Sequence, residues 1–236
     1  MTLRPPKHSD KKKIEAAMKK KQKEVELTHK LPPYTLVICE GIKTEVHYIQ
    51  GLINLINAKY SEINRRYSHL FPKDRITVFG TGRNTESLLK YTRDYTIKPE
   101  NKHYSRIWLM YDKDDFPNDN FDNTQFSIND YNDQDRQFFA AWSNECLELW
   151  FVLHFQDLKA NVSREQYQTI LKRYFDYDKT LINLFEILEE KGDSNQAILR
   201  AKKLYEENKH KNSPSQMAPV TRVYELVEEL REYLVE

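Results

Sequence analysis

Three carboxylate side chains follow two short apolar runs of the chain. Glu40 comes directly after the run LVIC, and Asp112 and Asp114 come directly after the run IWLMY. Carboxylates brought to one place repel one another, so such a group is favoured only where a cation neutralises it. Magnesium prefers oxygen ligands and bridges protein carboxylates to substrate phosphates. These residue types therefore predict metal-assisted phosphoryl transfer.

The elements around these residues predict how they are brought together. Apolar, β-rich runs predict strands at 35–39, 75–79, 105–111 and 138–142, and helical spacing predicts helices at 44–58 and 84–95. Strands that alternate with helices indicate an α/β fold with a central parallel sheet. Ligands of such sheets lie beyond the carboxyl ends of the strands, where Glu40, Asp112 and Asp114 fall. If the strand continues past Asp112, the two aspartates point the same way, roughly 6.6 Å apart.

The C-terminal part of the chain changes character. Apolar residues recur at i, i+3 and i+4 spacing over 163–174, 180–191, 195–208 and 220–235, with a polar loop at 209–219. We expect this part to be all helix, packed on or beside the sheet. The predicted organisation is therefore a basic N-terminal arm (1–31), partly helical or disordered, a sheet domain (32–158) and a helical annex (159–236).

Charge is balanced over the whole chain but not along it. The 37 basic and 36 acidic residues nearly cancel. Residues 1–30 hold ten Lys and Arg against four acids, a net charge of +6, which leaves about −5 for the remainder. Such an arm either binds a phosphate backbone through counterion release or is a solvated, partly helical tail, and both interpretations stay open.

Several classes of protein are disfavoured. No apolar stretch suggests a membrane span or a signal peptide. Cys39 and Cys146 lie in apolar runs, which fits buried thiols in a reducing compartment better than a disulfide framework. We expect a cytoplasmic protein without membrane association.

The sequence after Glu40 is not a nucleotide-binding loop. A P-loop needs Gly-x-x-x-x-Gly-Lys-Ser/Thr. Here Ile42 separates Gly41 from Lys43, and no glycine precedes them at the required distance. Any dependence on ATP is therefore expected to come from another polypeptide. A glycine after Glu40 would instead let the backbone turn tightly.

Residues near these carboxylates have functional and structural interpretations. Lys43 either contacts a substrate phosphate or pairs with Glu45, which itself suits the first turn of a helix. Glu148 precedes an apolar run and is expected near the core, where it needs a metal or a Lys or Arg partner. His47 and His154 have no second histidine at helical spacing, which favours structural roles.

The loop after the second predicted strand carries two glycines. Gly82 and Arg83 could bring a backbone amide and a guanidinium to a phosphate. Alternatively, the glycines supply turn geometry and Asn84 caps the next helix.

Three segments resemble the characteristic blocks of the RloB-like proteins, also called the AbiLii family. They are LVICEGIKTEVHY (36–48), IWLMYDKDD (107–115) and SNECLELWFVLHF (143–155). The resemblance implies a Toprim-like sheet in which Glu40, Asp112 and Asp114 hold Mg²⁺, with Mn²⁺ as an alternative. It also implies that Glu148 lies near the site. Glu145 departs from the pattern, because the family usually has proline there.

The same resemblance implies a function and partners. Its members are found in bacterial phage-defence and restriction loci, commonly beside a separately encoded ATPase. The implied activity is metal-dependent cleavage of DNA or RNA in anti-phage defence. The sequence leaves the oligomeric state open, with a homo-oligomer among the alternatives. The alternative is a non-catalytic sensor or regulatory subunit that binds nucleic acid or the ATPase.

Overall fold

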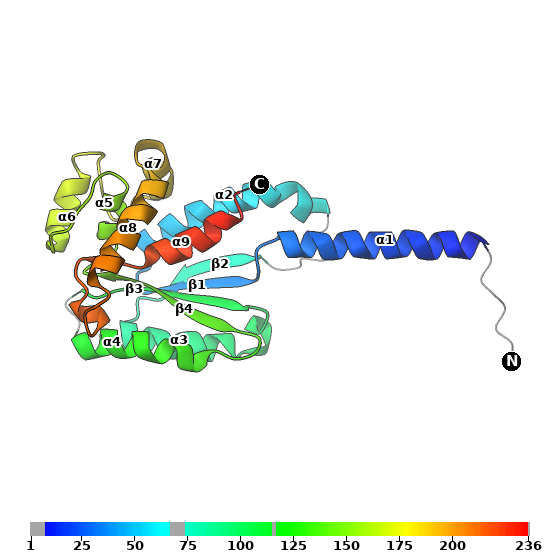
Figure 1. The fold of residues 1–236 in the computed structure, drawn as a ribbon, viewed down its shortest axis with the longest axis horizontal. Helices are drawn as coiled ribbons and strands as arrows, with labels where there is room; N and C mark the ends of the chain where they lie inside the picture. Colours follow the sequence, from blue (N-terminus) through cyan, green and yellow to red (C-terminus); the bar gives the residue numbers. More distant parts are fainter. Residues whose placement is uncertain (1–7, 67–73, 115–116, 236) are drawn as a thin grey trace. The chain divides into compact units, whose positions relative to one another are not determined.

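A computed structural model describes residues 8–66, 74–114 and 117–235 of the chain (Figure 1). The chain divides into two units, residues 1–32 and 33–236. The first unit contains helix α1 (His8–Lys30). Its side chains from Lys11 to Glu26 are exposed, apart from a half-buried Glu24 that pairs with Lys20 at 3.9 Å. The described part of the basic arm is thus helical with exposed side chains, which fits both interpretations of the arm.

The second unit is built on a sheet of strands in the order β2-β1-β3-β4-β5. The strands are β1 (Thr35–Cys39), β2 (Ile76–Gly80), β3 (Arg106–Asp112), β4 (Gln137–Asn144) and β5 (Val220–Thr221). Strands β1 to β4 run parallel, and β5 pairs antiparallel with β4. The predicted α/β fold is confirmed, with a sheet that is mostly rather than wholly parallel.

Helices connect the parallel strands, as parallel pairing requires. They are α2 (Thr44–Arg66), α3 (Thr85–Thr96) and α4 (Asn118–Ser127), with short 3₁₀ turns at Pro99–Asn101 and Ile128–Tyr131. Helix α2 extends two turns beyond its predicted end at residue 58. Helix α4 was not predicted, because its sequence NDNFDNTQFS is polar and has little apolar periodicity.

The two faces of the sheet follow from the alternation of side chains along buried strands. Val37 and Met110 pack into a core shared with α2 and the C-terminal helices. Ile38 and Leu109 pack into a second core with Leu88 of α3 and other buried residues of α3 and α4. Figure 1 shows α3 and α4 on one side of the sheet and α2 and α9 on the other. Both faces are covered, which explains why the strands are almost continuously apolar.

The C-terminal region holds helices α5 (Glu148–Leu153), α6 (Arg164–Leu171), α7 (Leu184–Lys191), α8 (Ser194–Asn208) and α9 (Val223–Glu232), with a 3₁₀ turn at Pro214–Gln216. The expectation that this region is entirely helical was wrong. Val220 and Thr221 form β5, and the Arg222 N–H donates to the Trp142 carbonyl at 2.7 Å. The short strand supplies partners to backbone groups of β4, which would otherwise lie at an open edge.

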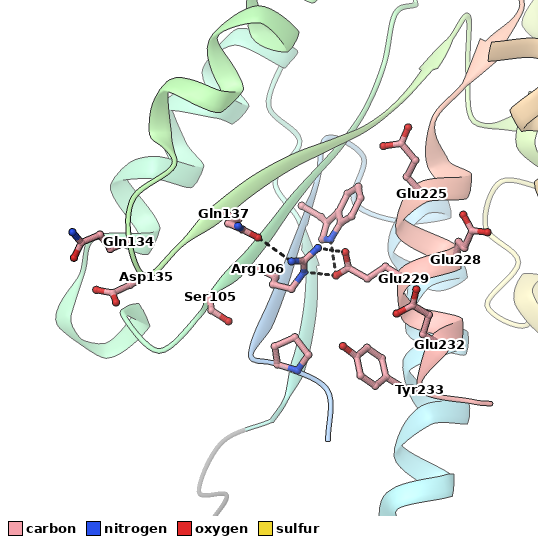
Figure 2. A pocket seen from close by; sticks show the side chains of 12 residues that line it. Ser105, Arg106, Gln134, Asp135, Gln137, Glu225, Glu228, Glu229, Glu232 and Tyr233 are labelled. Atoms are coloured by element: carbon pink, nitrogen blue, oxygen red, sulfur yellow. Dashed lines mark hydrogen bonds and ion pairs between the residues drawn. The ribbon is translucent and has the colours of Figure 1, made fainter. Parts of the chain in front are cut away.

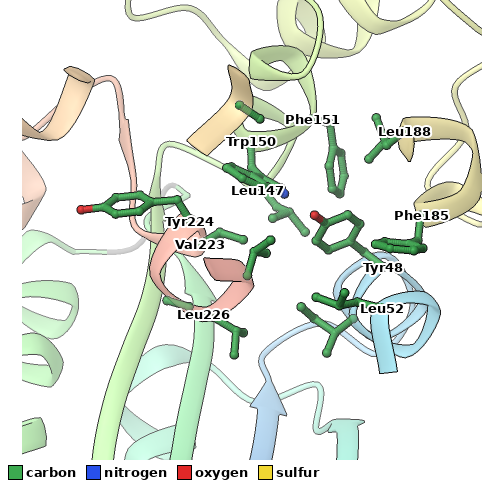
Figure 3. Packing of buried hydrophobic residues seen from close by; sticks show 14 of the residues in the cluster. Tyr48, Leu52, Leu147, Trp150, Phe151, Phe185, Leu188, Val223, Tyr224 and Leu226 are labelled. Carbon is green, nitrogen blue, oxygen red and sulfur yellow. The ribbon is translucent and has the colours of Figure 1, made fainter. Parts of the chain in front are cut away.

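The C-terminal helices share a core with the sheet. Tyr48 of α2 lies against Phe151 of α5 and Phe185 of α7, with ring centroids 5.4 and 5.8 Å apart. Figure 3 shows these rings in the same cluster as Val223 and Leu226 of α9. The predicted boundary near residue 158 therefore falls inside the second unit. In the described part of the chain, no helix combines the length and apolar character needed to cross a membrane.

Candidate functional site

The carboxyl ends of β1 and β3 lie side by side, which brings Glu40 to Asp112. Cys39 and Met110 are register partners, and the Glu40 N–H donates to the Met110 carbonyl at 2.8 Å. The Asp112 N–H in turn donates to Glu40 Oε2 at 3.3 Å. The sheet therefore fixes the backbone at both positions and holds one carboxylate against the other strand.

Asp114 reaches the same place by a different route from the one predicted. Strand β3 ends at Asp112, so the assumption of a continuing strand was wrong. Asp114 has a φ of 42°, a left-handed conformation that aspartate adopts more readily than most residues. Its N–H donates to the Glu145 carbonyl at 3.1 Å. The peptide bond before Glu145 is cis.

Arg164 joins the carboxylates that the sequence placed at the site. Its Nη2 lies 3.2 Å from Asp112 Oδ2 and also pairs with Asp114 Oδ1. Its Nε lies 3.9 Å from Glu148 Oε2. Sequence reasoning missed this residue because it comes from α6, in the region treated as an annex. The signal at hand was the Ser163–Gln166 spacing, which starts a helix at Arg164 but does not indicate a partner.

Glu148 is buried and ion-paired, as expected for a carboxylate next to an apolar run. Its side chain is 5% exposed. Besides Arg164, it accepts from Tyr177 Oη at 3.2 Å and from Gln168 Nε2 at 3.3 Å, and Lys179 Nζ lies 3.6 Å away. The partners all come from residues after 163, so the C-terminal region completes the site around Glu148.

These residues line one cavity of about 350 Å³. Among the described residues, it is lined by the carboxylates of Glu40, Glu45, Asp112, Asp114 and Glu148 and by the cations Lys43, Arg164 and Lys179. The three carboxylates predicted as ligands, Glu40, Asp112 and Asp114, are thus brought together, and the additional candidates Glu45 and Glu148 line the same cavity.

Gly41 leaves room for the Glu45 side chain rather than supplying a positive φ. Its φ is not positive, but a Cβ there would lie 2.2 Å from Glu45 Oε2. Gly80 of β2 is more tightly constrained, because a Cβ would lie 2.1 Å from the Gly41 carbonyl oxygen, a backbone atom. The two glycines therefore let the loop after β1 pack closely on β2 and under the Glu45 carboxylate.

Burial and mutual repulsion raise the pKa values of acidic side chains in this cavity. Burial, with the charges of Asp114 and Glu45, raises the pKa of Glu40 to about 7. Burial and neighbouring carboxylates also raise the pKa values of Glu45, Asp112 and Asp114. Burial lowers the pKa of Arg164, but the charges of the surrounding acids outweigh it and the net shift is upward. A bound cation would oppose the upward shifts of the carboxyl pKa values, because it stabilises the charged form of each carboxylate.

The donor set suits a hard divalent cation. Carboxylate oxygens are the ligands that Mg²⁺ prefers, and a bound dication would offset the burial and the repulsion that raise these pKa values. Within the described residues, however, no three His, Cys, Asp or Glu side chains are placed together so that they could hold a metal ion. The Arg164 guanidinium lies among the oxygens that would do so.

The predicted phosphate-binding loop does not line this cavity. The Gly82 N–H donates to the Glu40 carbonyl at 2.8 Å, and Gly82 has a φ of 64° that glycine adopts readily. The Arg83 guanidinium lies 4.5 Å from the Tyr91 ring centroid. Asn84 caps α3 by accepting from the Ser87 N–H at 3.1 Å. The structural interpretation of Asn84 is confirmed, and Arg83 lies away from the carboxylates.

The histidines and cysteines also have structural environments. His47 Nδ1 lies 3.3 Å from the Leu181 carbonyl, and His154 Nδ1 lies 3.0 Å from the Trp150 carbonyl. Cys39 and Cys146 are buried free thiols, and burial raises the pKa of both. A high thiol pKa disfavours the thiolate and hence nucleophilic catalysis.

A larger cavity, of about 710 Å³, lies at the opposite ends of the strands (Figure 2). It is lined by the starts of β3 and β4 and by glutamates of α9. Arg106 donates to Glu229 through Nε at 2.7 Å and to Gln137 at 3.0 Å, and Trp108 donates to Glu229 at 3.3 Å. The central charges of this cavity are thus paired with each other, and the amino ends of parallel strands seldom hold ligands.

Comparison with known proteins agrees with the blocks seen in the sequence. A family model described as RloB-like protein matches residues 35–230, a span that covers the whole sheet and also α6 with Arg164. Neither the curated proteins nor the solved structures contain a match to the chain. Since the model covers most of the chain, the protein belongs to the RloB-like family.

Proposed function

We propose that this protein is a divalent-metal-dependent nuclease with a Toprim-like sheet, acting on DNA or RNA in anti-phage defence. The observation that carries the proposal is the convergence of Glu40, Asp112, Asp114 and Glu148 in one cavity at the carboxyl ends of β1 and β3. Membership of the RloB-like family supports it. Control by a separately encoded ATPase is part of the proposal.

Asp112, Asp114 and Glu40 are the residues that would hold Mg²⁺ or Mn²⁺. When bound, the metal ion would neutralise a substrate phosphate and stabilise the oxygens that attack and leave. Lys43 and Lys179 line the same cavity and would pair with other phosphate oxygens. With the metal ion and the two lysines, the site would attract a polyanionic substrate although its other side chains are acidic.

Glu40 would serve as general base where it is not a ligand. A pKa of about 7 lets it be ionised and still accept a proton at neutral pH. In this step the oxygen of a water molecule would form a bond to phosphorus and its proton would pass to Glu40, while the bond from phosphorus to the leaving sugar oxygen breaks and that oxygen takes a proton from solvent water.

The test is cleavage by the purified full chain. Wild type and Asp112→Asn are incubated with labelled DNA and total RNA in Mg²⁺, Mn²⁺ or chelator, with and without the neighbouring ATPase. We expect cleavage that needs metal and falls at least about 10³-fold in Asp112→Asn. Asp130→Asn, at an exposed position outside the cavity, is the matched control and should keep wild-type activity.

The pairing of Arg164 with both Asp112 and Asp114 favours a second candidate, a binding or sensing subunit that keeps the fold without turnover. Tight nucleic-acid or ATPase binding, no cleavage with any metal and normal phage protection by the Asp112→Asn variant would establish it. The same outcome would overturn the nuclease proposal.

A further inference from the structure

Arg164 does not bind the carboxylate cluster as a bidentate fork. Elsewhere in the described residues, Arg222 forms a bidentate pair with Glu225. Its Nε donates to Glu225 Oε1 at 2.7 Å and its Nη2 donates to Oε2 at 2.6 Å. Arg164 instead shares one nitrogen, Nη2, between Asp112 and Asp114. Its Nε is buried and has no hydrogen-bond partner. An arginine kept only for stability would be expected to satisfy its fork.

The guanidinium lies where a cation would bridge the two aspartates. It contacts oxygens of Asp112 and Asp114 and approaches Glu148. A divalent cation bound to the same oxygens would overlap the guanidinium and repel it. The Arg164 side chain is 28% exposed, so a path to solvent is open to it.

The helix that carries Arg164 holds it at the edge of the cavity. The Ser163 N–H donates to Gln166 Oε1 at 2.9 Å, which fixes the first turn of α6. Arg164 therefore stays beside the site after its side chain is displaced. There its planar fork matches phosphate oxygens.

We propose that Arg164 is an internal counter-ion that occupies the cation position between Asp112 and Asp114, is displaced by a divalent metal ion and then pairs with the substrate phosphate. The inference rests on the proposed metal-dependent site and adds how that site is kept neutral before loading. It also couples metal binding to the C-terminal helix α6.

The first test is direct titration of Mn²⁺ into the full chain, without substrate, by isothermal calorimetry. Arg164→Gln removes the competing charge, and we expect Mn²⁺ to bind about tenfold or more tightly than to wild type. Arg173→Gln, an exposed arginine just after α6, is the matched control and should bind like wild type. Circular dichroism establishes that each variant is folded.

The second test needs no variant. Hydrogen exchange of wild-type amides in α6 should become faster when Mn²⁺ is added, because the ion pairs that tie Arg164 to β3 are lost.

The outcomes separate the two proposals. Equal or weaker Mn²⁺ binding by folded Arg164→Gln, or metal binding that leaves exchange in α6 unchanged, overturns the counter-ion role and leaves the nuclease proposal standing. Absence of Mn²⁺ binding by both wild type and Arg164→Gln overturns the counter-ion role and the metal site together. Both outcomes are read from metal binding and hydrogen exchange, so they do not depend on whether the protein cleaves nucleic acid.

Discussion

Arg164 Nη2 lies 3.2 Å from Asp112 Oδ2, although the two residues are 52 positions apart. This ion pair joins the carboxyl end of the central strand β3 to the first turn of α6. The candidate site is therefore not a property of the sheet alone. Changes in the C-terminal helices should alter its chemistry, and loading of the site should alter those helices.

The two glycines under the site should respond differently to the same substitution. Gly41→Ala places a Cβ against the Glu45 carboxylate, the end of a side chain that can turn away. Gly80→Ala places a Cβ against the backbone of Gly41 and Ile42, which cannot move without shifting the loop. We expect Gly80→Ala to lower the free energy of unfolding by about 1–3 kcal/mol, and Gly41→Ala by less.

Urea unfolding of the two variants measures this difference. Gly41→Ala should still weaken Mn²⁺ binding, because Glu45 is displaced from the cavity. A larger loss of stability in Gly41→Ala than in Gly80→Ala would show that the Glu45 carboxylate cannot relocate and that the packing argument is wrong.

Glu40 should make the protein less stable as it ionises. Its folded-state pKa of about 7 lies above its ordinary value, mainly because of burial. A raised carboxyl pKa contributes stability that is fully present below about pH 4.5 and is lost as pH rises through about 7. Glu40→Gln should therefore be more stable than wild type at pH 8 by about 1–2 kcal/mol, a figure discounted for partial exposure, in the presence of chelator.

The measurement is urea unfolding of both proteins at pH 4.5, 6, 7 and 8. The difference between them should grow with pH, and saturating Mn²⁺ should reverse its sign at pH 8, because only wild type keeps the Glu40 ligand. A difference that does not change with pH would mean that Glu40 titrates normally.

The sheet and its acidic edge were predictable because strand patterns are local. Each of β1 to β4 is a short apolar run, and parallel pairing alone brings Glu40 beside Asp112. The predicted position of Asp114 near Asp112 is right, but it assumed a continuing strand. The strand ends at Asp112, and the left-handed conformation of Asp114 turns the chain back. The sequence pattern predicts that Asp114 lies at the site but not the backbone conformation that brings it there.

The remainder of the site depends on contacts between distant segments. Arg164 and Lys179 lie on amphipathic or polar stretches that look like any solvated surface. Only the packing of α6 and of the segment that follows it brings them to Glu148 of α5. Strand β5 has two residues, too few for any periodicity. Such features follow from tertiary packing, which local patterns do not encode.

His154 should make the protein sensitive to acid. It is 2% exposed, its ring centroid lies 4.9 Å from that of Trp150, and burial lowers its pKa to about 4 despite the Trp150 carbonyl. Between about pH 6.5 and 4, His154 binds a proton in the unfolded chain but not in the folded protein. The free energy of unfolding therefore falls as pH falls through this window. The contribution approaches about 3 kcal/mol at pH 4.

The check compares slopes rather than absolute stabilities, because His154→Gln also loses packing. Unfolding free energies at pH 7, 6, 5 and 4 should fall less steeply for His154→Gln than for wild type. The matched control His210→Gln, at an exposed histidine, should keep the wild-type slope. Equal slopes for all three proteins would show that His154 becomes protonated without unfolding.

The basic helix α1 offers a prediction that separates the two interpretations of the arm. Lys11, Lys12 and Lys13 are exposed and would release counterions on contact with a phosphate backbone. If the arm binds nucleic acid, replacing all three with Gln should reduce the slope of log K against log salt concentration by about 2–3. Lys90, Lys102 and Lys191, exposed on the second unit, form the matched triple control. Titration of labelled DNA and RNA at several salt concentrations gives the slopes, and an unchanged slope in the first triple variant would identify α1 as a solvated helix without a role in phosphate binding.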